Sequence, residues 1–373
     1  MYLLLSSFAL CNALLILGNS APVVDRRGHY EAQDTPVNFD AKTMAEFTAR
    51  MEEYGALHRK VAATLPKLSD NATPQEIDRH QRDLGTRMAQ ARSGAKPGDL
   101  FPNAANALKF AVLGDFGTGE PMQYALARRM AAEHKAFPFE MVVLVGDNIY
   151  GADRPQDYAN KFELPYKPLL DAGVKFYGSL GNHDAREQRF YKLFNMEGKQ
   201  YYTFKAPKQD VRFVALESTY MEPEQLAWFE RTLAAASEDW VIVFQHHPIY
   251  SSGITHGSDE RLRSVLEPLL MKYGVDLMLT GHDHIYERSK PQHDITHFVA
   301  GSGGKLRPGD VRPNQPFSAK VNDQTNVFLA VEILDDQLVF NAYATNGSVV
   351  DSGAITRVAK PAAEAPALGG ARE

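Results

Sequence analysis

Side chains that can bind a metal ion or move a proton follow short apolar runs at several places in the chain. The run 141–145 leads directly into Gly146, Asp147 and, three residues later, Tyr150. An apolar run of this length, bounded by glycine, predicts a buried strand, and open α/β sheets bind ligands at the carboxyl ends of their strands. Polar residues that follow such runs elsewhere in the chain are Asp115, Asn182, His183, His246, His282 and His284.

Each of these motifs alone also has a purely structural explanation. A Gly-Asp pair after a strand is a common turn, an Asn or Asp there often caps a helix, and a single histidine is often a hydrogen-bonded core residue. The joint pattern is more specific, because five of the 12 histidines fall between positions 246 and 284. Carboxylate, amide and imidazole groups are predicted to meet at one edge of one sheet. Oxygen and nitrogen donors without a thiolate indicate a hard or borderline metal ion.

The elements that must position these residues alternate between strand, loop and helix from residue 108 onward, as in α/β domains with crossover connections. We predict strands at 110–113, 141–145, 175–180, 211–216, 240–244 and 275–279. We predict helices between them at 122–134, 159–170, 223–236 and 259–273. The remaining predicted segments are a strand end at 298–300, a glycine-rich loop at 301–304, a hairpin at 327–333 and 337–343, and a strand at 349–358.

The polar strand ends resemble an ordered set of family motifs. The motifs are GDFG at 114–117, GDNIY at 146–150, GNHD at 181–184, HHP at 246–248 and GHDH at 281–284. Together they resemble the five motifs of calcineurin-like metallophosphoesterases and, more narrowly, those of purple acid phosphatases of the small, tartrate-resistant type. The resemblance covers about residues 108–358. It implies an α/β fold, a four-layer α/β/β/α sandwich in which two packed mixed sheets are flanked by helices.

Two positions carry the resemblance to the narrower group. Many metallophosphoesterases have an Asp-x-His first motif whose histidine binds the first metal, and Gly117 stands at that position here. Purple acid phosphatases use instead a tyrosine three residues after the bridging aspartate, where this chain has Tyr150. The alternative for Tyr150 is an aromatic side chain packed at the mouth of a loop.

The resemblance implies a dinuclear metal centre in which Asp147 bridges the two ions. The ligands that it implies for metal 1 are Asp115, Asp147, Tyr150 and His284. The ligands that it implies for metal 2 are Asp147, Asn182, His246 and His282. A tyrosine oxygen is a hard, anionic donor, which favours Fe(III) at site 1, with Fe, Zn or Mn at site 2.

Three further histidines receive other roles. His183 matches the family's histidine that assists the leaving group, because a departing alkoxide needs a proton or a positive neighbour. His256 resembles a second histidine that lines the substrate pocket, although its spacing from His246 is one residue longer than expected, and an exposed loop histidine is the alternative. His247 lies at a position without a ligand in the family and is interpreted as structural.

The implied activity is hydrolysis of phosphate monoesters, with a metal-bound hydroxide as the nucleophile and a small phosphorylated molecule as substrate. Two other interpretations stay open. One is a phosphodiesterase or nucleotide hydrolase of the same superfamily, and the other is a non-catalytic protein that keeps the metal site as a scaffold.

Composition limits the partners. The 373 residues are 44% hydrophobic and 23% charged, as in ordinary globular proteins, with 46 acidic and 40 basic side chains and a net charge of -6. Since there is no long block of one sign, neither a nucleic-acid surface nor an acidic tail is indicated.

The first 20 residues resemble a secretory signal, because 2–17 is almost wholly apolar and small residues precede Ala21. No Lys or Arg precedes the apolar run, so an uncleaved anchor or a misplaced start stays open. Cleavage would give a secreted or periplasmic protein without stable membrane association. It would also remove Cys11, the single cysteine, and leave no disulfide.

A helical region is predicted between this segment and the α/β domain. Apolar residues recur every three or four positions over 44–65 and stop at Pro66, and Thr73 begins a second helical pattern as an N-cap. The two helices are predicted to form a hairpin. His58 and His80 have no partners at metal-ligand spacing. The predicted organisation is a signal peptide at 1–20, a helical region and linker at 21–105, a catalytic domain at 106–358 and a disordered tail at 359–373.

Overall fold

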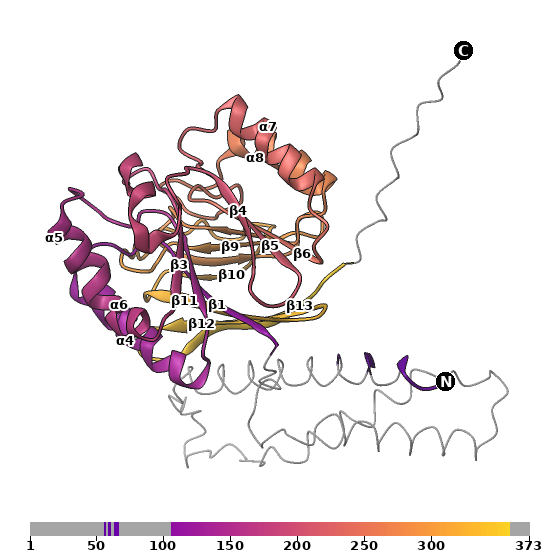
Figure 1. Ribbon diagram of the computed structural model, residues 1–373, viewed down its shortest axis with the longest axis horizontal. Helices are drawn as coiled ribbons and strands as arrows, with labels where there is room; N and C mark the ends of the chain where they lie inside the picture. Colours follow the sequence, from indigo (N-terminus) through magenta and orange to yellow (C-terminus); the bar gives the residue numbers. More distant parts are fainter. Residues whose placement is uncertain (1–55, 57–58, 61–62, 67–105, 359–373) are drawn as a thin grey trace, which may run out of the picture. The chain divides into compact units, whose positions relative to one another are not determined.

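The strands of the protein assemble into two sheets. The computed structural model describes residues 56, 59–60, 63–66 and 106–358 (Figure 1). Within 106–358, one mixed sheet has six strands and a second mixed sheet has seven. None of the helices in these described ranges combines the length and apolar character needed to cross a membrane.

The first sheet has the strand order β13-β12-β11-β1-β2-β3, and β1, β2 and β3 run parallel. Its strands are β1 (Leu108–Leu113), β2 (Met141–Val145), β3 (Lys175–Ser179), β11 (Val327–Leu334), β12 (Gln337–Ala344) and β13 (Val349–Thr356). The strand β11 pairs antiparallel with β1, and β12 and β13 continue the antiparallel half.

The second sheet has the order β10-β8-β9-β7-β6-β5-β4, with β5, β6, β7 and β9 parallel. Its strands are β4 (Tyr202–Lys205), β5 (Val211–Ala215), β6 (Trp240–Phe244), β7 (Leu277–Thr280), β8 (Tyr286–Ser289), β9 (Thr296–Ala300) and β10 (Ser318–Asn322). The strands β4, β8 and β10 pair antiparallel with their neighbours.

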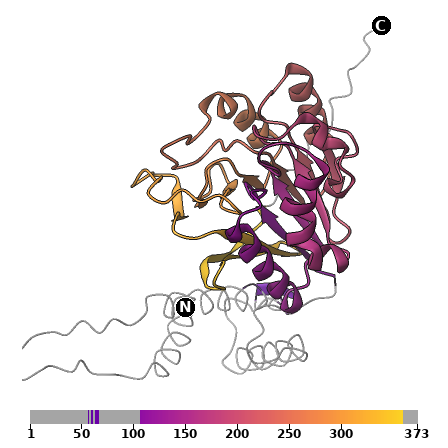
Figure 2. The ribbon, with the colours of Figure 1, turned by 90° about the vertical axis from the view of Figure 1, so that its left-hand side faces the viewer.

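Helices cover the outer faces of both sheets, as two views show (Figures 1 and 2). The helices are α4 (Pro121–Ala136), α5 (Pro155–Tyr158), α6 (Leu164–Asp171), α7 (Pro223–Ala234) and α8 (Glu260–Lys272), with a π-helical turn at Ala159–Glu163 and 3-10 turns at Arg186–Phe190 and Lys192–Phe194. Buried residues of α4 and α6 pack with the first sheet, and those of α7 and α8 pack with the second.

Side-chain alternation explains why the sheets stack. Successive residues of a strand point to opposite faces, so an all-apolar strand is buried on both sides. In β6, Ile242 belongs to the core between the sheets, whereas its neighbour Val243 packs with α7 and α8. Phe110 of β1 and Phe213 of β5 meet edge to face, with ring centroids 5.3 Å apart. The predicted four-layer α/β/β/α sandwich is therefore confirmed.

One part of the sequence interpretation is wrong. The motif-bearing strands do not share one sheet, because β1, β2 and β3 lie in the first sheet and β6 and β7 lie in the second. Apolar runs show that a strand is buried but not which strands it pairs with. The strands β4, β8 and β10 were not predicted. Their sequences, YTFK, YERS and SAKVN, contain no continuous apolar run.

Other predictions fall largely on residues outside the described ranges. Ala56, Arg59, Lys60 and Ala63 are helical, as the first helical pattern predicts. The segment 1–20, the second helix of the predicted hairpin, the linker and the tail at 359–373 lie outside the described residues.

Candidate metal centre

The loops that carry the predicted ligands begin in an unusual backbone conformation. Asp115, Asp147 and His282 all have positive φ, at 54°, 51° and 71°. Such values are uncommon for residues other than glycine and concentrate at functional sites, where the surrounding structure offsets their cost. Gly146 makes room for this arrangement, because an added Cβ there would lie 2.5 Å from His246 Nδ1.

One group of donor atoms gathers around Asp115. The Tyr150 hydroxyl donates to Asp115 Oδ1 at 3.2 Å and lies 3.3 Å from His284 Nε2. His284 Nε2 is 3.5 Å from Asp115 Oδ1. Asp115, Asp147 and His284 each offer one ligand atom within 4.8 Å of the others. Since metal–ligand bonds of about 2.0–2.2 Å separate neighbouring ligand atoms by roughly 3 Å, this spacing fits a metal site.

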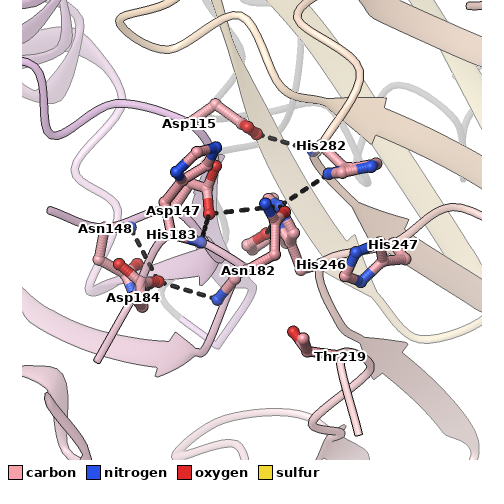
Figure 3. Close-up of polar contacts among 12 residues, drawn as sticks. Asp115, Asp147, Asn148, Asn182, His183, Asp184, Thr219, His246, His247 and His282 are labelled. Atoms are coloured by element: carbon pink, nitrogen blue, oxygen red, sulfur yellow. Dashed lines mark hydrogen bonds and ion pairs between the residues drawn. The ribbon is translucent and has the colours of Figure 1, made fainter. Parts of the chain in front are cut away.

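A second group converges on His246 Nε2 (Figure 3). This nitrogen lies 3.1 Å from Asn182 Oδ1 and 3.2 Å from His282 Nδ1. It is 3.4 Å from Asp147 Oδ1. The other ring nitrogen of His246, Nδ1, lies 2.9 Å from the Val145 carbonyl oxygen. A proton on Nδ1, donated to that carbonyl, leaves Nε2 with a free lone pair aimed at the group.

The charge balance of the two groups favours a bound cation. Asp115 and Asp147 are 0% and 1% exposed, and within 106–358 neither has a Lys or Arg at ion-pair distance. Burial, followed by the charge of Asp147, raises the pKa of Asp115. Burial and the nearby carboxylates likewise raise the pKa of the Tyr150 phenol. Buried acidic groups are costly unless a positive charge balances them, so the two donor groups are suited to bind a cation.

The imidazoles do not supply that charge. Burial is the largest cause that lowers the pKa of His246 and of His282, and neighbouring histidines add to it. Burial, with Arg307 as the next cause, lowers the pKa of His284 to about 4. Near neutral pH these rings are therefore unprotonated, which is the form that binds metal ions.

The other predicted histidines lie at the same site. The backbone N–H of His183 donates to Asp147 Oδ1 at 3.0 Å, and its exposed ring lies 5.1 Å from the Tyr150 ring. His256 is exposed, with its ring 4.1 Å from that of His282. His247 Nδ1 lies 2.9 Å from the Ser218 hydroxyl, and its ring is 4.3 Å from that of His282.

Close packing explains the glycine in the first motif. A Cβ added to Gly117 would lie 1.8 Å from the Asn148 carbonyl oxygen, so no side chain fits there. The Tyr150 N–H donates to the Gly117 carbonyl at 2.9 Å. The first loop and the loop bearing Tyr150 are therefore held in direct contact.

Sequence reasoning missed two neighbours of the site, Asp184 and Lys305. Asp184 accepts hydrogen bonds from the N–H groups of Gly181, Asn148 and Ile149 at 2.8, 3.0 and 3.1 Å, so it ties the second loop to the third. The position of Asp184 in the GNHD motif could have indicated this role from the sequence. Lys305, whose ammonium lies 4.9 Å from the centre of the Tyr150 ring, had no comparable signal.

Part of the chain matches a known protein family in sequence. Residues 108–286 match the family model of the calcineurin-like phosphoesterases. Human tartrate-resistant acid phosphatase type 5 is 25% identical over 310 residues, which cover 70% of this chain and 95% of that protein. Purple acid phosphatase 7 of Arabidopsis thaliana is 24% identical over 286 residues, covering 67% and 86%.

Structural comparison agrees on the fold. GAP50, the anchor in the inner membrane complex of Plasmodium, superposes with a TM-score of 0.59 at 22% identity, covering 68% of this chain and 90% of that one. A purple acid phosphatase from yellow lupin seeds gives 0.58 at 22% identity, covering 69% and 55%. The family match and the acid phosphatase relatives imply divalent metal ions and support a phosphatase hydrolase. Residues 108–286 thus match the calcineurin-like phosphoesterase family, and purple and tartrate-resistant acid phosphatases are among the proteins to which the chain is similar.

Proposed function

We propose that the protein hydrolyses phosphate monoesters at a dinuclear metal centre between the carboxyl ends of the two sheets. The observation that carries this proposal is the convergence of two adjacent groups of donor atoms that share Asp147. Its Oδ1 lies 3.4 Å from His246 Nε2, and Asp147 also offers a ligand atom to the group with Asp115 and His284.

The proximity of the donor atoms within each group supports the proposed ligand sets. In the proposal, metal 1 is held by Asp115, Asp147, Tyr150 and His284, and metal 2 by Asp147, Asn182, His246 and His282. When bound, two such ions lower the pKa of a water molecule and neutralise the charge of the phosphoryl oxygens. The phenol oxygen of Tyr150 favours Fe(III) at site 1, with Fe, Zn or Mn at site 2.

In this proposal, residues of the chain also orient the bridging carboxylate and assist the leaving group. The His183 N–H fixes the orientation of the Asp147 carboxylate, since it donates to Oδ1 at 3.0 Å. His183 and His256 are exposed, with their rings 5.1 Å from the Tyr150 ring and 4.1 Å from the His282 ring, so the proposal assigns both to the leaving group. Either ring can give a proton to the leaving oxygen or stabilise its charge.

A comparison of two substrates tests the proposed specificity. The protein should hydrolyse p-nitrophenyl phosphate with a higher kcat/KM than bis(p-nitrophenyl) phosphate, because a monoester leaves more of its oxygens free for two cations. Both reactions release the same phenolate and can be followed at one wavelength. A strong preference for the diester would reject the monoesterase in favour of a phosphodiesterase.

The remaining proposals concern the chain as a whole. We propose that 106–358 is the catalytic domain, preceded by the region 21–105, and that cleavage after Ser20 exports the protein. Small phosphorylated molecules would be its substrates, with no stable nucleic-acid partner. Mass measurement of the amino terminus, on protein purified from its native compartment, tests the cleavage. Retention of residues 1–20 would reject it.

A further inference from the structure

A pair of hydrogen-bonded loops forms one wall of the candidate metal centre. The Arg312 N–H donates to the Ser252 carbonyl at 2.8 Å, and the Ile254 N–H donates to the Asp310 carbonyl at 3.1 Å. The Thr255 hydroxyl donates to the Asp310 carboxylate at 2.7 Å. The loop that bears His256 is thus joined to the segment 305–312, which follows the glycine-rich loop.

The backbone of this segment is tied directly to predicted ligands. The Lys305 N–H donates to the Asp115 carbonyl at 3.0 Å, and the Arg307 N–H donates to the His284 carbonyl at 3.2 Å. Two basic residues therefore stand beside the metal 1 group, on a backbone that is hydrogen-bonded to two of its ligand residues. Arg307 is partly neutralised, because its guanidinium lies 3.4 Å from Asp310 Oδ2.

The side chain of Lys305, unlike that of Arg307, has no ion-pair partner among the described residues. Its ammonium lies 4.9 Å from the centre of the Tyr150 ring, so it faces the metal 1 group. The residue is half-buried, and no carboxylate of the described residues lies within ion-pair distance of its ammonium. A partly desolvated ammonium without a counterion is well placed to accept an anionic group of a ligand.

We propose that Lys305 determines substrate specificity by binding a second phosphoryl group. The site then favours diphosphates over phosphate esters whose leaving group carries no charge in the intact substrate. This inference rests on the proposed hydrolysis at the same site. In pyrophosphate, the water oxygen bonds to one phosphorus, the bridging oxygen leaves on the other phosphate, and the two water protons end on the two phosphates. Lys305 holds the departing phosphate, and Arg307 adds positive charge beside it.

Steady-state kinetics on Lys305→Met and Lys305→Arg tests the proposal, with pyrophosphate and p-nitrophenyl phosphate as substrates. Lys305→Met should reduce kcat/KM for pyrophosphate at least about tenfold more than for p-nitrophenyl phosphate, the scale of one lost hydrogen bond to a charged group. Lys305→Arg keeps the positive charge and should therefore retain most of the wild-type kcat/KM for pyrophosphate. The control is Lys175→Met, which removes the same charge from the exposed amino-terminal end of β3 and should leave both values unchanged.

A binding measurement separates this proposal from the proposed hydrolysis. Calorimetry with methylenediphosphonate and methylphosphonate should show a preference for the diphosphonate that Lys305→Met abolishes, with metal content checked before and after. If the wild-type protein hydrolyses no p-nitrophenyl phosphate, the proposed function fails while the binding result still reports on Lys305. Equal kinetic losses for both substrates, or an unchanged preference for the diphosphonate in Lys305→Met, would overturn the role of Lys305.

Discussion

At the scale of single residues, Asp147 is the position on which the two donor groups depend. It is buried, has positive φ, and receives the His183 N–H on the same oxygen that faces His246. Neutralising this carboxylate keeps its shape but removes the charge that two neighbouring cations would share. The consequence should appear in metal content as well as in turnover.

We expect Asp147→Asn to lose bound metal and to reduce hydrolysis of p-nitrophenyl phosphate by about two orders of magnitude or more. Elemental analysis and initial rates measure the two effects, and circular dichroism checks the fold. Asp171→Asn, at an exposed carboxylate that pairs with Lys167, is the matched control. Wild-type activity in Asp147→Asn would show that the reaction occurs elsewhere.

Tyr150 should report the identity of the ion at site 1. A phenolate bound to Fe(III) gives a charge-transfer band in the visible range, so the purified protein should be purple and Tyr150→Phe should be bleached. The control is Tyr124→Phe, since that hydroxyl donates to the Asn160 carbonyl at 2.6 Å and has no contact with the predicted ligands. Colourless wild-type protein with two equivalents of zinc would reject iron but not the fold.

Gly117 should tolerate no side chain, because an added Cβ would lie 1.8 Å from the Asn148 carbonyl oxygen. We expect Gly117→Ala to reduce the free energy of unfolding by about 1–3 kcal/mol and to weaken metal binding, since it displaces the loop between Asp147 and Tyr150. Chemical denaturation measures the stability. At Gly178, by contrast, the nearest atom to an added Cβ lies at 3.4 Å, an ordinary contact, so Gly178→Ala should be milder. Equal effects of the two substitutions would contradict the steric argument.

At the scale of elements, an ion-paired cluster fastens the amino ends of β5 and β6. Arg212 donates to both oxygens of Glu238 at 2.7 Å, and the Lys205 ammonium lies 2.6 Å from Oε1. Burial alone would raise the pKa of Glu238, but the hydrogen bonds from Arg212 and Lys205 outweigh it and lower the pKa from 4.5 to about 2. A carboxylate with a lowered pKa stabilises the folded state at pH values above its unfolded pKa.

Replacing Glu238 by Gln should therefore reduce the free energy of unfolding by roughly 1.5–3 kcal/mol near neutral pH. The difference from wild type should be complete above about pH 4.5 and should shrink as the pH falls toward 2, where the wild-type carboxylate becomes protonated. Urea denaturation at several pH values measures it. A difference that did not depend on pH would mean that shape, not charge, makes the contribution.

Sequence reasoning predicted the long elements and the ligand types but not their assembly. The run in β2 and the polar residues after it were recognisable because burial and the turn leave a local pattern. The division of the strands between two sheets was not recognisable from the sequence. Asp147 and His246 approach each other only through the pairing of distant strands. Lys305 was missed for the same reason, because its relation to Tyr150 exists only in three dimensions.

At the scale of the whole domain, the candidate centre is where the two sheets meet through polar groups rather than through apolar packing. Asp115 and Asp147 come from the first sheet, and His246 and His284 follow strands of the second. Without bound cations the buried carboxylates repel each other, as the raised pKa of Asp115 reflects after the effect of burial. Metal ions would therefore add stability as well as chemistry.

Removing the metals should lower the thermal stability of the protein. Ions that bind only the folded state stabilise it by RT ln(1 + [L]/Kd), which is about 4 kcal/mol at a thousandfold excess over Kd. For a domain of this size, that loss should lower Tm by roughly 8 °C or more. Differential scanning calorimetry before and after chelation and dialysis measures the shift, and readdition of metal should reverse it.

The Asp147→Asn variant supplies the internal control for that experiment. If the stabilisation comes from ions at the shared site, the variant should resemble the chelated wild type and should respond little to chelation itself. An equal shift in both proteins would place the stabilising ion elsewhere. An unchanged Tm in the wild type, with metal loss verified by elemental analysis, would mean that apolar packing between the sheets alone holds the site in position.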